Sequence, residues 1–279
     1  MTTLDALARP SGTFAMVAMD QRESLRTMLR EHGHDDGDER VARFKASVAR
    51  ELAPHASGFL IDAEHAAAVA PLVPHGLILA VDRLVQERGG IVEDTSLEEE
   101  VEPADAIVAL KLLVIWRDDE RRAQRVELAE RFVAIAARRG LLSVLEPVVR
   151  HDDRDWAIIE AAAELGATRP SLYKCQVPLE GKGDPAEITR RARQIDAALP
   201  CPWVVLSQGV AADDFPRAVD AACRGGASGF LAGRALWTPT LGADDPTELL
   251  RERSVPRLRE LAAIVDRHGR SWREKAASA

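Results

Sequence analysis

Lys174 is the residue with the clearest chemical potential, because it lies inside an apolar run, Ser-Leu-Tyr-Lys-Cys-Gln-Val-Pro, at 171–178. Only five of the 37 basic residues are lysines, so a strand lysine suggests a role that arginine cannot fill. Burial favours the neutral amine of a lysine. A neutral amine forms a Schiff base with a ketone, which then accepts electrons, whereas a guanidinium does not. The alternative interpretation is a structural ion pair.

Two more ionisable residues interrupt apolar runs. Glu146 lies within 141–149, and Lys111 lies within 107–116. A buried carboxyl beside an amine nucleophile can move the protons that carbinolamine dehydration and carbon–carbon cleavage require. Lys111 could favour the neutral amine of Lys174 by like-charge repulsion, or bind a substrate oxygen. Alternatively, Glu146 is an ion-pair partner of a lysine, and Lys111 is an edge lysine whose ammonium reaches water.

Short apolar runs alternate with helix-period segments from end to end. Most runs are continuously apolar, as in parallel strands that are covered on both faces. The expected strands are 14–20, 58–63, 77–82, 107–116, 141–149, 171–178, 203–209 and 228–233. The expected helices are 22–31, 40–53, 118–139, 154–166, 185–199, 213–224 and 246–268. Eight strands with helices between them in about 250 residues predict an α/β fold, a single closed (β/α)8 TIM barrel.

The predicted barrel domain covers residues 1–279, with a frayed polar tail at about 270–279 and an acidic connection at 83–104 that holds one or two short helical pieces. An open doubly wound sheet is the rival fold. It would need a glycine-rich first turn to bind a dinucleotide. The first expected strand ends Ala-Met-Asp-Gln-Arg at 18–22, without glycine. The barrel is therefore favoured.

Polar side chains end or interrupt nearly every expected strand. In a barrel, the active site is built at the C-terminal ends of the strands, so a shared polar centre is predicted. Asp20 could orient substrate hydroxyls there, while Asp62 and Asp82 could equally cap the segments that follow them. The residues concerned are Asp20, Asp62, Asp82, Lys111, Glu146, Lys174, Ser207 and Arg234.

The last two expected strands end in an anion-site pattern. Ser207-Gln208-Gly209 follows the seventh strand and Ala232-Gly233-Arg234 the eighth. Barrels commonly bind phosphate at this position, where glycine amides face the anion. Arg234 would add a bidentate clamp. Gln21, Arg22, Arg117 and Arg150 are unranked candidates for a second anion.

Composition excludes several classes of function. The 279 residues carry a net charge of −8 without a clustered basic stripe, so a nucleic-acid partner is not expected. No apolar stretch approaches the roughly 18 residues of a membrane helix, and the N-terminus does not read as a signal peptide. Three cysteines without metal-type spacing indicate reduced thiols in a cytoplasm. We expect no metal, because His65, His75 and His151 are scattered and the His/Asp-rich stretch at 32–38 reads as a solvated loop.

These motifs resemble the class I aldolases related to tagatose-bisphosphate aldolase, and within them the bacterial sulfofructosephosphate aldolases of sulfoquinovose breakdown. Segments that carry the resemblance follow one another over nearly the whole chain. They lie at 11–16, 20–23, 109–114, 116–117, 146–150, 172–174, 178–179, 181–183, 202–204, 215–219 and 227–235. Two departures stand out: Gln208 occupies the place of a second serine, and Cys175-Gln176 replaces a Val-Glu pair.

The resemblance implies roles for the residues named above. Lys174 would be the Schiff-base lysine and Glu146 the acid/base. The substrate would be bound by Asp20, Gln21, Lys111, Ser207, Gly209, Gly233 and Arg234. The implied reaction needs no cofactor and cleaves 6-deoxy-6-sulfofructose 1-phosphate to dihydroxyacetone phosphate and 3-sulfolactaldehyde, in a homo-oligomer. A tagatose or fructose 1,6-bisphosphate aldolase is the alternative within the class. A non-catalytic sugar-phosphate-binding barrel would have no use for a strand lysine beside a strand glutamate.

Overall fold

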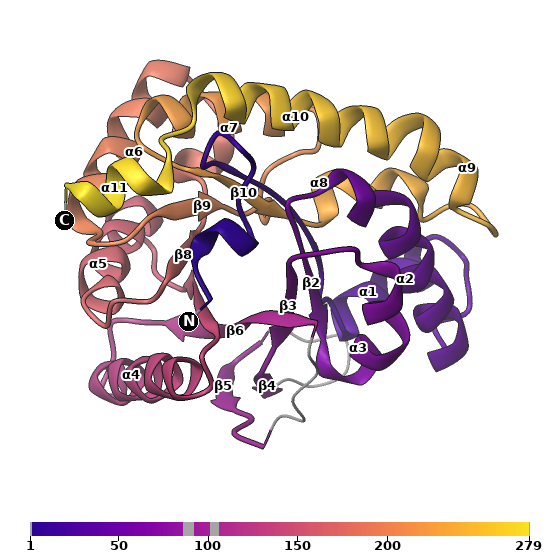
Figure 1. Ribbon diagram of the computed structural model, residues 1–279, viewed down its shortest axis with the longest axis horizontal. Coiled ribbons are helices and arrows are strands. Elements are labelled where there is room, and N and C mark those ends of the chain that lie inside the picture. Colours follow the sequence, from indigo (N-terminus) through magenta and orange to yellow (C-terminus); the bar gives the residue numbers. More distant parts are fainter. Residues whose placement is uncertain (1, 86–91, 101–105, 279) are drawn as a thin grey trace.

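Eight parallel strands close into a barrel in the computed structural model, which describes residues 2–85, 92–100 and 106–278 (Figure 1). The predicted TIM barrel is thereby confirmed. Around the ring the order is β1, β10, β9, β8, β7, β6, β3, β2. The barrel strands are β1 (Phe14–Met19), β2 (Gly58–Asp62), β3 (Leu77–Ala80), β6 (Ile107–Trp116), β7 (Leu142–Val149), β8 (Leu172–Cys175), β9 (Trp203–Val205) and β10 (Gly229–Ala232).

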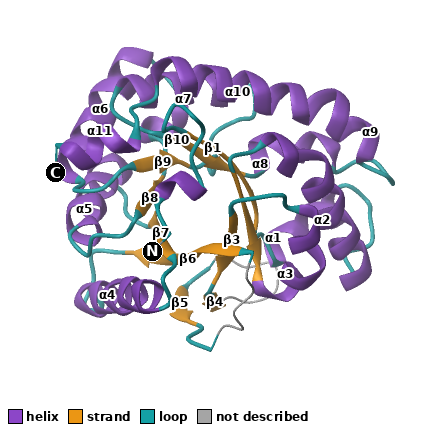
Figure 2. Ribbon diagram, in the orientation of Figure 1, coloured by secondary structure: helices purple, strands orange, loops and turns teal. Residues whose placement is uncertain are grey.

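Helices surround most of the ring (Figure 2). None of the described helices is long and apolar enough to cross a membrane. The helices are α1 (Glu23–Glu31), α2 (Asp38–Leu52), α3 (Ala63–Val69), α4 (Arg122–Arg138), α5 (Arg154–Gly166), α6 (Pro185–Ala198), α7 (Phe215–Arg224), α8 (Arg234–Trp237), α9 (Thr247–Leu249), α10 (Val255–His268) and α11 (Trp272–Ala277), with a π-helical turn at Leu250–Ser254 before α10.

Two apolar layers follow from strand alternation, because successive side chains point to opposite faces of a strand. One set fills the barrel interior: on β1 it comprises Phe14, Met16 and Ala18. The alternate set, such as Ala15 and Val17, packs against the helices. Both faces of the barrel strands are therefore largely buried, which explains why these strands read as continuous apolar runs.

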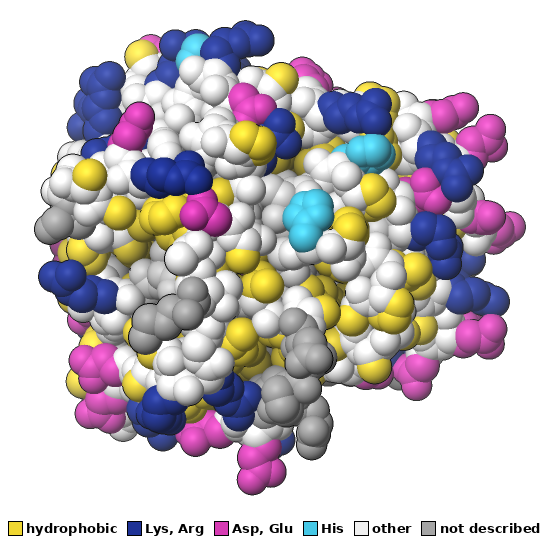
Figure 3. All heavy atoms as spheres, in the orientation of Figure 1, with side chains coloured by type: hydrophobic (Ala, Val, Ile, Leu, Met, Phe, Trp, Pro, Cys, Tyr) yellow, Lys and Arg dark blue, Asp and Glu magenta, His cyan; other side chains and the backbone are white. Residues whose placement is uncertain are grey.

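The N-terminal segment closes one end of the barrel. Leu4 and Leu7 join the interior cluster, and Leu7 lies beside Gly58, at the start of β2. The short helical turn Leu4–Ala6 crosses the centre of the ring in Figure 1. On this face, charged side chains gather mainly at the periphery (Figure 3). A polar site is accordingly expected at the other end, where the strands terminate.

Residues 82–97 differ from the sequence-based expectation of short helical pieces. They contain an antiparallel hairpin, β4 (Asp82–Val85) paired with β5 (Asp94–Leu97). Leu97 packs on the outer apolar cluster, so the hairpin is held by contacts with the barrel that local sequence does not encode. The rest of the expected connection, at 86–91 and 101–105, lies outside the described residues.

The C-terminal tail also differs from the expected fraying, because Trp272–Ala277 forms α11. Lys275 is buried and donates to the Asp196 carbonyl at 2.6 Å. Arg270 also pairs with the Asp196 carboxylate, at 2.9 Å. Contacts with a helix distant in sequence therefore order this segment.

Asp62 serves a structural role beside the barrel. Its carboxylate caps α3 by accepting from the backbone N–H of His65 at 3.2 Å, and it forms a fully buried ion pair with Lys45. Burial lowers the pKa of Lys45, and the Asp62 charge opposes this effect. The capping interpretation of Asp62 is confirmed.

Candidate active site

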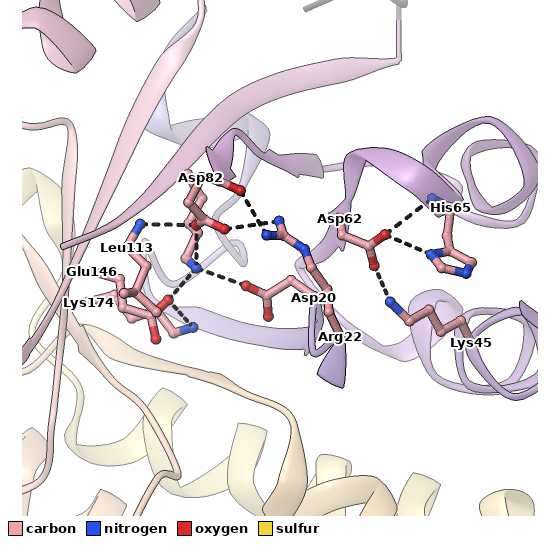
Figure 4. A network of polar contacts seen from close by, with 10 residues as sticks. Asp20, Arg22, Lys45, Asp62, His65, Asp82, Leu113, Glu146 and Lys174 are labelled. Atoms are coloured by element: carbon pink, nitrogen blue, oxygen red, sulfur yellow. Dashed lines mark hydrogen bonds and ion pairs between the residues drawn. The ribbon is translucent and has the colours of Figure 1, made fainter. Parts of the chain in front are cut away.

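A polar layer lies directly above the apolar interior of the barrel. Continuing the inward alternation past Ala18 on β1 gives Asp20, and past Ala80 on β3 gives Asp82. The same alternation gives Lys111 after Ala109, Glu146 after Val144 and Lys174 after Leu172. Figure 4 shows the side chains of Asp20, Asp82, Glu146 and Lys174 converging from separate strands. The structure therefore brings together four of the predicted site residues, Asp20, Lys111, Glu146 and Lys174.

Lys111 is held by three carboxylates. Its Nζ lies 2.8 Å from Asp20 Oδ2, 2.9 Å from Asp82 Oδ2 and 2.8 Å from Glu146 Oε2. Burial alone would lower the pKa of Lys111, but the three negative charges outweigh it and raise that pKa well above its usual value. Lys111 is thus held as a cation. Its side chain is 1% exposed, which corrects the edge-lysine interpretation.

Lys174 has a different environment. Its Nζ lies 2.9 Å from Glu146 Oε2, and the side chains of Lys174 and Glu146 are 4% and 8% exposed. No other ion pair of Lys174 occurs among the described residues. Glu146 Oε2 is buried and accepts no hydrogen bond with good geometry, although both lysines lie close to it. Glu146 thus lies between Lys111, which three carboxylates hold, and Lys174, which pairs with Glu146 alone among the described residues.

Asp82 belongs to this network and does not act as a cap. Besides Lys111, it accepts from the backbone N–H of Leu113 at 3.0 Å. Arg22 donates to its carbonyl at 2.8 Å and its carboxylate at 2.9 Å. The alternation Ile78, Ala80, Asp82 could have placed Asp82 in the site from sequence. Asp20, like Asp82, forms an ion pair with Lys111. Burial would raise the pKa of Asp20, but the positive charges of Lys111 and Lys174 hold that pKa below its usual range.

A cavity of about 220 Å³ opens above the polar layer. Gln21 and Arg234, both predicted site residues, line it. Lys174 is not among the lining residues, but its Nζ lies 2.9 Å from Glu146, which is one of them. The cavity is lined by Asp20, Gln21, Arg22, Glu23, Ser24, Asp82, Leu84, Val92, Lys111, Leu113, Ile115, Glu146, Val148, Arg150, Gln208 and Arg234.

Arg234 joins this cavity to a second hollow of about 320 Å³ that Ser207 and Gly209 line. Its guanidinium makes no hydrogen bond or ion pair with another residue in the described part of the chain. Burial lowers the pKa of Arg234, opposed by the charges of Glu146 and Asp20. At Gly233 a Cβ would lie 2.4 Å from the carbonyl oxygen of Ala18, so only glycine fits beside β1. The four predicted anion-site residues therefore lie together.

The histidines do not converge on the cavity. His65 Nδ1 contacts Asp62 at 2.7 Å, His75 Nε2 lies 3.0 Å from the carbonyl oxygen of Ala56, and His151 packs on Trp156 with 4.9 Å between ring centroids. None of the three is among the residues that line it.

The two departures from the family pattern have different surroundings. Gln208 lines the cavity, where it can contact a ligand. Gln176 is buried, and its Oε1 accepts from the backbone N–H of Val149 at 2.8 Å. Cys175 is also buried, and burial raises the pKa of its thiol. The departure at Cys175-Gln176 therefore lies in the buried barrel wall, whereas the departure at Gln208 lies in the lining of the cavity.

The chain thus combines a closed parallel barrel with a layer of lysines and carboxylates above its apolar interior. The profile of the DeoC/LacD family aldolases matches residues 14–239. The chain belongs to this family, so it is a lyase of the class I aldolase type. It is 24% identical to tagatose 1,6-diphosphate aldolase 2 of Streptococcus agalactiae, over 98% of this chain and 97% of that one. It is 25% identical to tagatose 1,6-diphosphate aldolase of Staphylococcus epidermidis, over 99% and 98%.

Solved aldolase structures share the fold. Fructose-bisphosphate aldolase of Plasmodium falciparum superposes with a TM-score of 0.69 at 13% identity, covering 96% of this chain and 94% of that one. An archaeal fructose-1,6-bisphosphate aldolase, in which the catalytic lysine is bound to a carbinolamine intermediate, superposes with a TM-score of 0.61 at 17% identity, covering 94% and 98%.

Proposed function

We propose that this aldolase works through a Schiff base on Lys174 and cleaves 6-deoxy-6-sulfofructose 1-phosphate. One observation carries the catalytic part: of the two lysines in the polar layer, Lys111 is held by three carboxylates, while among the described residues Lys174 pairs with Glu146 alone, at 2.9 Å. A lysine must lose its proton to act as a nucleophile. Glu146 is within reach to accept that proton, and Lys111 is held as a charge.

The reaction would begin when the Lys174 amine adds to the C2 ketone. Glu146 then donates a proton to the carbinolamine hydroxyl, and water leaves to give an iminium. A base takes the proton of the C4 hydroxyl, the C3–C4 bond breaks, and its electron pair flows into the iminium to form an enamine. The aldehyde, 3-sulfolactaldehyde, departs. Protonation of the enamine at C3 and hydrolysis release dihydroxyacetone phosphate and the free lysine.

The phosphate of the dihydroxyacetone half would lie against Arg234. A partly buried guanidinium without a protein counter-ion is suited to two parallel hydrogen bonds to an oxyanion. Gly233 brings the backbone close at this point, and Ser207 adds a hydroxyl on the same side. Asp20 and Lys111, fixed to each other at 2.8 Å, would orient the hydroxyls of the sugar chain.

The second candidate substrate is tagatose or fructose 1,6-bisphosphate. It is favoured by the names of the relatives that match this chain along its whole length at 24–25% identity. The sulfonated substrate is supported by the resemblance of the sequence segments to the sulfofructosephosphate aldolases. Both bisphosphates differ from the sulfonated substrate at the C6 anion, since sulfonate carries one negative charge and phosphate carries up to two at neutral pH. Tagatose 1,6-bisphosphate also has the opposite configuration at C4.

Cleavage rates on the two kinds of ketose test this proposal. We expect kcat/KM for 6-deoxy-6-sulfofructose 1-phosphate to exceed that for tagatose or fructose 1,6-bisphosphate by at least about tenfold, which corresponds to about 1.4 kcal/mol in transition-state binding. Production of dihydroxyacetone phosphate is followed with a coupled dehydrogenase. A preference for a bisphosphate would overturn the sulfonated substrate and leave the Schiff-base chemistry standing.

A further inference from the structure

A second arginine of the cavity, Arg150, has no ion-pair partner in the part of the chain that the structure describes. Arg150 follows β7 on the same face as Glu146 and Val148, and all three line the cavity together with Arg234. On the ring, β8 and β9 separate β7 from β10, so Arg150 and Arg234 stand three steps apart in a circle of eight strands. The reacting groups, Glu146 and Lys111, line the cavity with them. Arg150 and Arg234 therefore place positive charges on two different sides of the cavity.

The cations around Arg150 are neutralised, but Arg150 is not. Arg117 pairs with Glu93 at 2.8 Å, and Arg154 pairs with Glu180. Arg150 makes no side-chain hydrogen bond or ion pair within the described ranges, and its Nε is buried without a partner. Burial foremost, and then the charges of Arg117 and Arg154, lower the pKa of Arg150, while the charge of Glu93 opposes them. Arg150 is half-buried, and a partly desolvated guanidinium without an ion-pair partner among the described residues favours an anionic ligand.

The backbone that carries Arg150 is firmly held. Its N–H donates to the carbonyl oxygen of Trp116 at 2.9 Å. The preceding N–H, of Val149, donates to the buried Gln176 side chain at 2.8 Å. The side chain of Arg150 therefore starts from a fixed position on the barrel wall.

Other candidates for a second anion are less suitable. Arg22 is committed to Asp82 through two hydrogen bonds, at 2.8 and 2.9 Å. Arg117 is paired with Glu93 and is not among the residues that line the cavity. Gln21 lines the cavity but is uncharged, and its Oε1 is a buried acceptor without a partner. Of the four candidates, Arg150 is the one that lines the cavity, carries a positive charge and has no ion-pair partner among the described residues.

We propose that Arg150 binds the terminal oxyanion of the aldehyde half of the substrate and so makes the enzyme selective for anionic over neutral aldehydes. The inference rests on the proposed aldol reaction. The guanidinium presents two parallel N–H donors to two oxygens of a tetrahedral sulfonate or phosphate. One cation balances a singly charged sulfonate, which is the aldehyde terminus of the proposed substrate.

The reverse reaction tests this role, because it supplies the two halves separately. Dihydroxyacetone phosphate is condensed with 3-sulfolactaldehyde, with glyceraldehyde 3-phosphate or with uncharged glyceraldehyde. For Arg150→Met we expect the ratio of kcat/KM for 3-sulfolactaldehyde to that for glyceraldehyde to fall by about 10–150-fold, which is the worth of a hydrogen bond to a charged group. The same ratio for glyceraldehyde 3-phosphate shows whether Arg150 reads sulfonate in particular or any oxyanion.

Two further variants separate the possible outcomes. Arg117→Met removes a neighbouring, paired arginine and should leave the ratio within about twofold, as a surface ion pair contributes little. Arg234→Lys should slow condensation with every aldehyde, because dihydroxyacetone phosphate is common to all. An unchanged ratio in a folded Arg150→Met enzyme, or an equal fall in Arg117→Met, would overturn the proposal. Absence of condensation with any aldehyde in the unaltered enzyme would instead refute the proposed function.

Discussion

Replacement of Lys174 by methionine is expected to lower aldol cleavage by about 10⁴–10⁶-fold, the range found when a covalent nucleophile is removed. Methionine has a similar length and suits an apolar strand, so β8 should be preserved. Glu146 also keeps a cationic partner, because Lys111 lies 2.8 Å from its Oε2. The loss of activity should therefore come from the missing nucleophile and not from unfolding, and the melting temperature should change by only a few degrees. Steady-state kinetics and thermal unfolding of the same preparation check both statements.

The chain offers a matched control for this experiment. Lys182 is another lysine near the same end of the barrel, but its side chain is 65% exposed and its partner is Glu180. Lys182→Met should keep cleavage within about twofold of the unaltered enzyme, in line with the small contribution of surface pairs. A folded Lys174→Met enzyme that retained more than a tenth of its activity would show that another group performs the nucleophilic step.

Replacement of Glu146 by glutamine is expected to cost about 10²–10⁴-fold in kcat, the usual contribution of a general acid–base group. Glutamine keeps the shape of the side chain but cannot exchange protons with the Lys174 amine or with the carbinolamine hydroxyl. Lys111 retains Asp20 and Asp82, at 2.8 and 2.9 Å, so the polar layer should remain assembled. KM should change by much less than kcat, since Arg234, the proposed anion-binding arginine, is untouched.

A glutamate outside the cavity provides the comparison. Glu180 pairs with Arg154 and Lys182 and does not line the cavity, so Glu180→Gln should leave kcat essentially unchanged. Near-normal turnover in Glu146→Gln would reduce Glu146 to an ion-pair partner of the two lysines. A rise in KM alone, at constant kcat, would make it a substrate-binding group.

The parts of the structure that sequence could predict are those that repeat a simple pattern. Each barrel strand buries both faces, so all eight appear as apolar runs, and polar residues at their ends mark the site. Lys174 and Glu146 stand out because a charge inside such a run is rare. The ion-pair partners of these residues could not be predicted from the sequence in this way. Asp20, Asp82 and Glu146 surround Lys111 only because distant strands meet when the barrel closes, and no local pattern encodes that meeting.

Segments that depend on long-range contacts were missed for the same reason. The hairpin of β4 and β5 is short and polar, and it is held in part by Leu97 against the outer core. Helix α11 is only Trp272–Ala277, which is too short to be stable alone, and Asp196 anchors it through Lys275. The choice of Arg150 as the second anion-binding arginine also needed the structure. Arg22 and Arg117 are paired with Asp82 and Glu93, and these pairs cannot be seen in the sequence.

Trapping of the covalent intermediate tests the central claim most directly. The enzyme is incubated with dihydroxyacetone phosphate and sodium borohydride, digested, and the modified peptide is located by mass spectrometry, with and without EDTA. The account predicts a reduced adduct on Lys174, loss of activity in proportion to labelling, and no effect of EDTA. An adduct on Lys111, or inactivation by EDTA with no adduct at all, would contradict it.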